Sequence, residues 1–338
     1  MKNSVLFFSM TYEFLRVFLP KEIGRSPNTV RSYSVALKQF SRYINEVLEI
    51  SIGSFEFKDC TRDCIFDFMK YLKEKGNSPS TRNYRLAALK SYLWFACDKD
   101  NSLQSIALEV KQVPQCKVPG KIRPTLTIQG VTEILKQPIN NKKGLRNLVF
   151  MILLLDTAAR LDELLSLTMD KMFLQAEYPF IIVRGKGDLE RKLYISDLTK
   201  KHLEKYLSIY HDKDSIKINF VFYTIIHGKA GKIAEGTIEH FVQKYADSAR
   251  FTCSDIPMHV FPHQFRACRA TQLYQENVPL DIISRKLGHS QLETTRIYAK
   301  PSEAMQRKTL NSIPIPKFKK HSKQWKDKEK ELTKKFGF

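Results

Sequence analysis

The sequence predicts a mainly α-helical protein of the α+β class, in which a helical N-terminal domain precedes a mostly helical second domain with a small antiparallel β-sheet. Apolar residues recur at helical spacing through the first hundred positions. Between 111 and 125, the segment KQVPQCKVPGKIRPT holds three Pro, one Gly and no apolar period, which is typical of a linker. Two strand-like runs between 178 and 196 flank the turn GKGD and predict a β-hairpin.

Chain length supports a division into two domains. The 338 residues are enough for two units that each bury a core. We expect a helical domain over 1–112, a basic linker over 113–125, a second domain over 126–302 and a basic tail over 303–338. From 317 onward the tail holds nine Lys against three acids, so it is expected either as a basic helix or as a disordered segment.

The charge of the chain indicates a polyanionic partner. Lys plus Arg number 56 against 35 Asp plus Glu, which gives a formal charge of +21. The basic residues are spread through the folded part and are not confined to one amphipathic segment, which favours nucleic acid over a membrane surface. A solvated basic surface without a ligand is the competing interpretation.

Several classes of protein are excluded by features that the sequence lacks. The longest apolar run, LVFMILLL at 148–155, is far shorter than the roughly 20 residues of a membrane span, and it predicts a buried helix. The first residues do not resemble a signal peptide, so we expect the chain in the cytoplasm, associated with the nucleoid. Six scattered Cys without a CxxC pair fit neither a disulfide framework nor a zinc site. No metal ion or other cofactor is expected.

Two helices of the first domain are expected to begin in the same way. Ser26 precedes Pro27 and Ser78 precedes Pro79, and a capping hydroxyl followed by Pro is a good helix start. Both helices place cations among their polar positions, as a face that contacts phosphates requires, although a solvated helix surface has the same pattern. The candidate DNA contacts are Arg31, Lys38, Arg42, Arg82, Arg85 and Lys90.

Helix-start residues also predict where helices of the second domain begin. Thr127 caps the segment TIQGVTEILKQ, and helical patterns resume from about 199, after the predicted hairpin. Pro262 begins a further helix on which His263 and Arg266 lie three residues apart. The two side chains therefore share one face and can contact one anion.

The next part of the chain predicts a tightly fixed turn. The helix PLDIISRKL ends at Gly288, the usual left-handed position after a helix, and His289 follows directly. Ser290 and Glu293 form a capping box for a third helix, which carries Tyr298 near its end. His289 is therefore expected between two capped helix ends.

Two basic residues precede this segment. Arg160 ends the most apolar run of the chain, where its guanidinium needs an anionic partner from protein or ligand, and Glu163 is the candidate within the protein. Lys186 stands in the hairpin turn between Gly185 and Gly187, which let the backbone turn sharply and leave the ammonium projecting. Taken singly, residues of these types are more often structural than catalytic.

In their order along the chain, these segments closely resemble the tyrosine recombinase (phage integrase) family. The resemblance covers about 125 to 300, and the helical N-terminal region resembles the core-binding domain of that family. Ala267 departs from the pattern, because many members have His there. The resemblance depends on Arg160 in AARLDELLSL, Lys186 in RGKGDLER, HQFR at 263–266, LGH at 287–289 and Tyr298.

The resemblance implies a site-specific DNA recombinase. Tyr298 would attack the scissile phosphate and form a 3′-phosphotyrosine with a free 5′-hydroxyl, without metal or ATP. Arg160 and Arg266 would clamp the phosphate oxygens, a task suited to planar and permanently charged guanidinium groups.

The remaining residues of the resemblance would handle protons and support the clamp. His263 would assist deprotonation of the tyrosine, and His289 would donate a hydrogen bond to the phosphate. Lys186 would protonate the leaving 5′-oxygen as a general acid. Glu163 matches an acidic position that is common after the first Arg, and a supporting role follows from that match.

The resemblance also implies an assembly. We expect a homotetramer on paired double-stranded DNA sites, with accessory recombination proteins and a tail over 303–338 that is passed to a neighbouring protomer. Integration or excision of a mobile element, transposition and resolution all stay open. Two alternatives are a type IB topoisomerase and a catalytically silent DNA-binding accessory protein; the six filled active-site positions argue against the latter.

Overall fold

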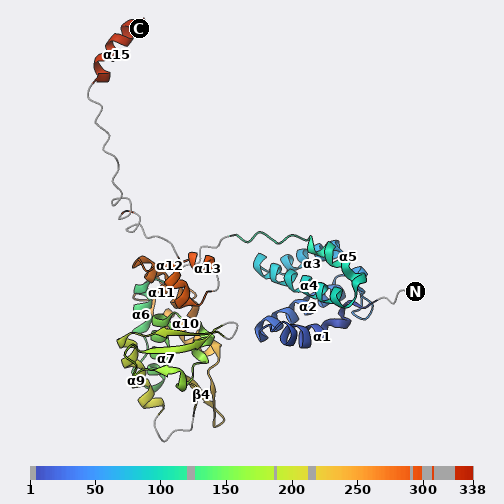
Figure 1. The fold of residues 1–338 in the computed structure, drawn as a ribbon, viewed down its shortest axis with the longest axis horizontal. Helices are drawn as coiled ribbons and strands as arrows, with labels where there is room; N and C mark the ends of the chain where they lie inside the picture. Colours follow the sequence, from blue (N-terminus) through green and yellow to red (C-terminus); the bar gives the residue numbers. More distant parts are fainter. Residues whose placement is uncertain are drawn as a thin grey trace. The chain divides into compact units, whose positions relative to one another are not determined.

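In the computed structural model the chain forms two compact units, Met1–Ile122 and Arg123–Phe338 (Figure 1). Each unit has a hydrophobic core of its own. The predicted class, mainly helical with a small antiparallel sheet, is confirmed. Within the described part of the chain, no helix is long and apolar enough to cross a membrane. The structure describes residues 5–119, 126–185, 189–211, 218–289, 292–298, 307 and 324–337.

The first unit is a helical bundle around an aromatic core. The ring of Phe7 is fully buried and meets Phe40 and Tyr92 edge to face, at centroid distances of 5.3 and 5.2 Å. The Tyr92 hydroxyl also donates a hydrogen bond to the Phe7 carbonyl oxygen. The α-helices are α1 (Thr11–Glu13), α2 (Pro27–Glu46), α3 (Arg62–Glu74), α4 (Pro79–Lys99) and α5 (Gln104–Lys111). Shorter 3₁₀ and π segments are Phe7–Met10, Phe14–Glu22, Phe57–Asp59 and Asn101–Leu103.

Both predicted Ser-Pro helix starts are confirmed. The Ser26 hydroxyl accepts a hydrogen bond from the Thr29 amide at 3.3 Å, and the Ser78 hydroxyl accepts one from the Thr81 amide at 3.2 Å. In each helix Pro occupies the first turn, where no amide proton is needed. Each cap contributes about 1 kcal/mol to stability.

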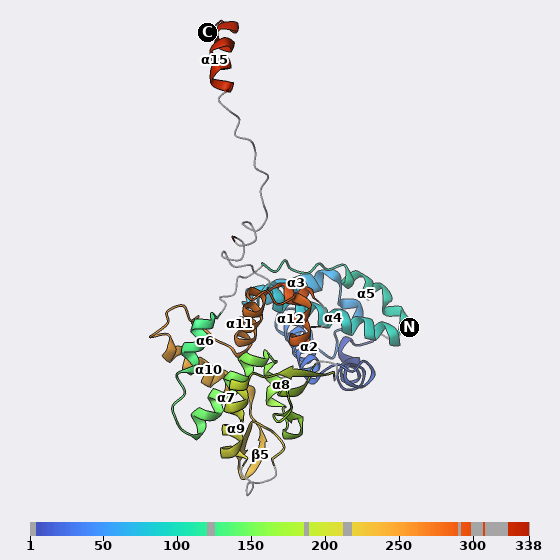
Figure 2. The same cartoon turned by 60° about the vertical axis from the view of Figure 1, so that its left-hand side comes forward.

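The second unit is built around α7, which is surrounded by α6, α9 and α11 (Figure 2). The buried helix predicted at 148–155 lies within α7, and the Thr127 hydroxyl caps α6 by accepting from the Gly130 amide at 3.0 Å. The helices before the tail are α6 (Ile128–Leu135), α7 (Lys142–Thr157), α8 (Leu161–Leu165), α9 (Asp197–Tyr210), α10 (Glu235–Ala249), α11 (Pro262–Gln275), α12 (Leu280–Leu287) and α13 (Glu293–Arg296). A 3₁₀ turn spans Met169–Lys171.

The predicted hairpin is confirmed as part of a three-stranded antiparallel sheet. Strand β2 (Phe180–Arg184) lies between β1 (Met172–Phe173) and β3 (Glu190–Tyr194). Alternate residues face the core, since Ile181 and Val183 are buried on β2. Residues 186–188 of the predicted turn, among them Lys186, lie outside the described residues.

Helices resume from about 199 as predicted, but the sequence analysis did not predict the two strands between 223 and 232. Strands β4 (Tyr223–Ile226) and β5 (Lys229–Lys232) form a second antiparallel hairpin there. His227 and Gly228 connect them with φ values of +49° and +74°. Two consecutive left-handed residues are the geometry of a type I′ turn, whose twist matches that of paired strands.

The C-terminal helices follow the predicted starts and stops. Pro262 lies in the first turn of α11, and Gly288 ends α12 in the left-handed conformation with φ of +63°. Ser290 lies outside the described residues, so the predicted capping box before α13 does too. In the tail, α15 (Gln324–Lys335) agrees with the basic-helix alternative.

Candidate active site

Four of the six predicted catalytic residues lie in one cluster, and they come from four places in the fold. Arg160 is the N-terminal cap residue of α8 and Arg266 lies on α11. His289 follows the end of α12, and Tyr298 follows α13. Hydrogen bonds and ring packing connect these residues into one continuous cluster, and Arg160 joins it through the Gly288 carbonyl oxygen.

Arg266 is the buried centre of the cluster, with an exposed fraction of 1%. Its Nη1 donates to the Ala158 carbonyl oxygen at 2.7 Å, and its Nη2 donates to the Leu287 carbonyl oxygen at 2.6 Å. Ala158 ends α7 with φ of +52°, which turns the backbone so that this carbonyl is available. Burial, followed by the charge of Arg160, lowers the pKa of Arg266 to about 10. The guanidinium therefore stays charged at neutral pH.

Among the described residues, no carboxylate forms an ion pair with Arg266. Both carbonyl acceptors are neutral, and its Nε finds no hydrogen-bond partner among the described residues. A buried cation is costly unless an anion compensates it. The cluster is therefore suited to receive an anionic ligand.

His289 is held as a hydrogen-bond acceptor. Its Nε2 lies 3.0 Å from Nη2 of Arg266. Because a guanidinium has only donors, Nε2 accepts, and the ring proton is therefore on Nδ1, which donates to the Thr295 hydroxyl at 2.8 Å. Burial, with the charges of Arg266 and Arg160, lowers the pKa of His289 to about 4. The imidazole is neutral at pH 7.

Tyr298 packs beside His289 with an exposed fraction of 8%. The two rings are nearly parallel, with centroids 6.3 Å apart. The Tyr298 amide donates to the Thr295 carbonyl oxygen at 3.0 Å, and the ring joins an apolar cluster that includes Ala158 and Leu287. Backbone and ring packing thus fix the phenol at the edge of the arginine cluster.

Arg160 is anchored by the predicted partner, Glu163. The Arg160 amide donates to Oε2 of Glu163 at 2.7 Å, and Nη1 donates to Oε1 at 2.9 Å. The other terminal nitrogen, Nη2, donates to the Gly288 carbonyl oxygen at 2.9 Å. Glu163 is buried, with an exposed fraction of 5%. Burial acts to raise the pKa of Glu163, but hydrogen bonds from Arg191 and Arg160 hold it below its usual value.

The two other predicted catalytic residues, His263 and Lys186, are not among the four that form the cluster. His263 is exposed in the first turn of α11, and its charge is among those that lower the pKa of His289. Lys186 lies outside the described residues. The base of its loop is described: the Gly185 amide donates to the Leu189 carbonyl oxygen at 2.9 Å.

Two residues of the site were missed from the sequence. Arg191 of β3 binds both carboxylate oxygens of Glu163 at 2.8 Å, and Thr295 is the fully buried partner of His289. A signal for Arg191 was present: it lies two residues before the buried Leu193, on the same face of the strand, where a charge requires a buried partner.

Gly288→Ala is expected to lower the free energy of unfolding by about 1–3 kcal/mol, because a side chain disfavours the left-handed conformation. The new Cβ would also lie 2.8 Å from Cζ of Arg191. Urea unfolding measures the loss. Gly236→Ala is the matched control: it lies in α10 with nothing within 4 Å of a new Cβ, so stability should be unchanged or slightly higher. Equal stability of the two variants would contradict the prediction.

The first unit offers exposed cations on α2, while two candidates on α4 bond within the protein. Nε of Arg85 donates to the Gln39 side chain at 2.7 Å. Nζ of Lys90 donates to the carbonyl oxygens of Lys111 and Val113 at 2.9 and 2.6 Å. Arg82 is half-buried. The exposed candidates are Arg31, Lys38 and Arg42.

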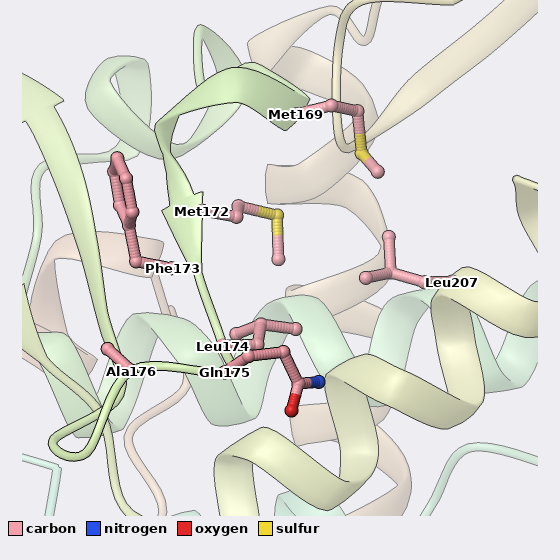
Figure 3. Close-up of a pocket in the computed structure, with 7 residues that line it drawn as sticks. All are labelled: Met169, Met172, Phe173, Leu174, Gln175, Ala176 and Leu207. Atoms are coloured by element: carbon pink, nitrogen blue, oxygen red, sulfur yellow. The ribbon is translucent and has the colours of Figure 1, made fainter.

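A separate apolar cleft of about 470 Å³ lies between β1 and α9 (Figure 3). Gln175 supplies the one polar side chain among its lining residues, and no lining residue is ionisable. The cleft therefore offers nothing for acid–base or anion chemistry, in contrast to the arginine cluster. Its lining residues are Met169, Met172, Phe173, Leu174, Gln175, Ala176 and Leu207.

Comparisons with known proteins cover most of the chain. The family model for the phage integrase family matches residues 124–305, and the phage integrase N-terminal SAM-like domain matches residues 13–100. Tyrosine recombinase XerA from Pyrococcus horikoshii is 28% identical over 295 residues, which cover 86% of this chain and 90% of that protein.

Two solved structures share the fold at low identity. The Tn1549 transposon integrase, in complex with a circular intermediate DNA, has a TM-score of 0.67 at 15% identity and covers 89% of this chain and 98% of that one. A λ integrase tetramer bound to a Holliday junction has a TM-score of 0.64 at 14% identity and covers 88% of this chain and 78% of that one.

Proposed function

The chain belongs to the phage integrase family, and from this premise we propose that it is a site-specific DNA recombinase that acts through a covalent 3′-phosphotyrosine. The observation that carries the proposal is the convergence of Arg160, Arg266, His289 and Tyr298 in one cluster. The cluster combines a nucleophile with cations that can neutralise a phosphodiester.

The proposed cleavage step is a transesterification at phosphorus. The Tyr298 oxygen forms a bond to the scissile phosphorus while the bond from phosphorus to the 5′-oxygen breaks. The phenol proton goes to a base, for which we propose His263, and the 5′-oxygen receives a proton from Lys186. Attack by the 5′-hydroxyl of a partner strand reverses these changes. Because the tyrosine ester conserves the bond energy, neither ATP nor a metal ion is required.

Arg160 and Arg266 are proposed as the phosphate clamp. Arg266 is charged, buried and without an anionic partner among the described residues, and its Nε is free to donate. The Arg160 side chain is 36% exposed, so a ligand can reach it. Guanidinium groups suit this task because they bind phosphate oxygens with two parallel donors.

The role of His289 requires a change on binding. In the free protein its Nε2 accepts a hydrogen bond from Arg266 and carries no proton. A bound phosphate would draw the Arg266 donor to itself and would add a negative charge that raises the pKa of His289. We propose that His289 takes up a proton at Nε2 at this point and then donates it in a hydrogen bond to the phosphate.

Double-stranded DNA is the proposed substrate, and a homotetramer on paired sites is the proposed assembly. The formal charge of +21 supports the first. The Tn1549 integrase structure contains DNA, and the λ integrase structure is a tetramer bound to a Holliday junction, which supports both proposals. We propose residues 1–112 as the core-binding domain, 113–125 as a basic linker and 126–302 as the catalytic domain. Integration, excision or transposition of a mobile element, with accessory proteins, is the proposed role.

The test is to trap the covalent intermediate on DNA from the neighbourhood of the protein's own coding sequence. Purified protein is mixed with a pool of these fragments and denatured in SDS, and any DNA that stays attached is sequenced. Attachment at one sequence supports site-specific recombination. Attachment scattered over many sequences, together with relaxation of a plasmid that lacks the site, would instead indicate a topoisomerase.

Deletion of residues 317–338 is expected to reduce recombination about tenfold or more, with DNA affinity changed by less than about threefold. The reason is that a tail passed to a neighbouring protomer, as proposed for 303–338, adds contacts only in the assembly. Recombination of a two-site plasmid and binding to a single site measure the two effects. A full-length control with the Lys residues of α15 changed to Gln removes charge and keeps length. An unchanged recombination rate after deletion would rule the exchange out.

A further inference from the structure

We propose that Arg191 is a positioning residue of the recombination reaction: it holds Arg160 and the turn before His289 in place and keeps the phosphate site positively charged. This inference rests on the proposed function. Arg191 has no part in the six-residue set that the sequence identified. It lies on β3, opposite Val183 of β2, and its side chain is 16% exposed.

Hydrogen bonding shows that Arg191 completes the environment of Glu163. The Glu163 carboxylate has an exposed fraction of 4% and receives four hydrogen bonds. Two come from Arg160, through its amide and Nη1, and two come from Nη1 and Nη2 of Arg191. A carboxylate offers about four lone-pair positions, so no acceptor position is left for another donor. Without Arg191, half of a buried carboxylate would be unsatisfied.

The charge balance explains why a second arginine is needed. Arg160 and Glu163 together are neutral, so this pair alone would add little attraction for a phosphate. Arg191 raises the formal charge of the three residues to +1 and forms its ion pair with Glu163. It also engages both carboxylate oxygens, so Arg160 is not the sole counterion of Glu163. Arg160 can then direct its charge toward a ligand.

Arg191 also fixes the backbone that leads to His289. Its Nε donates to the Lys286 carbonyl oxygen at 3.3 Å. A Cβ on Gly288 would lie 2.8 to 3.0 Å from three guanidinium atoms of Arg191, so the turn packs directly on this group. The Gly288 carbonyl oxygen accepts from Arg160. One guanidinium therefore connects β3, the start of α8 and the end of α12.

The geometry requires arginine and not simply a positive charge. Arg191 uses Nη1 and Nη2 for Glu163 and Nε for Lys286, in the fixed directions of a planar guanidinium. A lysine has one nitrogen on a flexible stem and cannot make both sets of bonds. Arg191→Lys therefore keeps the charge and loses the positioning.

The test compares single-turnover formation of the Tyr298–DNA adduct on a synthetic duplex of the trapped attachment site. Arg191→Met is expected to slow adduct formation about 100-fold, and Arg191→Lys about tenfold or more, with duplex affinity within about threefold of wild type. Lys192→Met is the matched control: it changes the neighbouring exposed cation on β3 and should leave the rate unchanged.

A double variant shows whether Arg191→Met is slow because the charge of the site has changed or because the protein has lost its fold. Glu163→Gln combined with Arg191→Met restores the formal charge of +1 and is expected to recover at least about tenfold of the rate that Arg191→Met loses. A double variant no faster than Arg191→Met, or an Arg191→Met protein at wild-type rate, overturns the proposal. If wild type and Lys192→Met form no adduct on any DNA, the proposed function fails and this inference fails with it.

Discussion

Tyr298→Phe is expected to abolish covalent attachment to DNA, by more than about 10⁴-fold, while DNA affinity stays near that of wild type. The substitution removes the phenol oxygen and keeps the ring. The ring makes the contacts with His289, Ala158 and Leu287, so the fold of the site should persist. The measurement is retention of labelled duplex by protein after denaturation in SDS, with binding followed separately by gel shift.

Tyr274→Phe is the matched control. Tyr274 lies on α11 and packs against the same small apolar cluster as Tyr298, but the proposed mechanism gives it no role. It should attach to DNA as wild type does. Attachment by Tyr298→Phe at the wild-type rate would mean that another nucleophile acts. Binding without attachment by wild type itself would favour the catalytically silent DNA-binding protein.

Features that depend on a few neighbouring residues could be predicted from the sequence. The Ser-Pro starts of α2 and α4 and the Gly288 stop of α12 were correct because capping involves atoms within one helical turn. The β4–β5 hairpin was missed for a physical reason. Ile225 and Ile226 follow each other in β4, so apolar and polar residues do not alternate there as they do in a half-buried strand. Both side chains are exposed, at 54% and 62%.

For the site, the sequence predicted most of the residues but few of the contacts between them. Residue types and their order were enough for a family resemblance, and the pairing of Arg160 with Glu163 could be predicted at a spacing of three. The contacts that define the site connect residues far apart in sequence: Arg191 is 28 residues from Glu163, and Gly288 is 128 from Arg160. That His289 accepts a hydrogen bond depends on the position of Arg266, which only the folded chain specifies.

Arg266→Lys is expected to slow adduct formation by about 10²–10³-fold, the effect of removing one well-placed donor from a charge-stabilising site. Arg266 bonds in three directions at once, to Ala158, Leu287 and His289. A single ammonium cannot replace these bonds, so at least one buried carbonyl loses its donor, at a cost of about 1–3 kcal/mol in stability. Single-turnover rates and urea unfolding measure the two effects.

The pH dependence distinguishes loss of charge from loss of geometry. Burial lowers the pKa of Arg266 to about 10, so wild type keeps this charge through the neutral range. The ordinary pKa of a lysine is about 10.4, and the same burial would lower it. The pKa of the lysine in Arg266→Lys would therefore lie below that of Arg266. The charge is present below the folded pKa and is lost as pH rises through it, so the activity of Arg266→Lys should fall at a lower pH than that of wild type.

Arg296→Lys supplies the comparison at an exposed site. Arg296 lies on α13, two residues before Tyr298, and its side chain is 67% exposed in a pair with Glu293. An exposed pair contributes little to stability, so this change should affect neither rate nor stability. If Arg266→Lys matched it in rate, stability and pH profile, the phosphate clamp would not include Arg266. A loss of rate that is confined to Arg266→Lys and grows with pH instead supports a role for the buried guanidinium, because Arg296→Lys makes the same substitution at an exposed side chain.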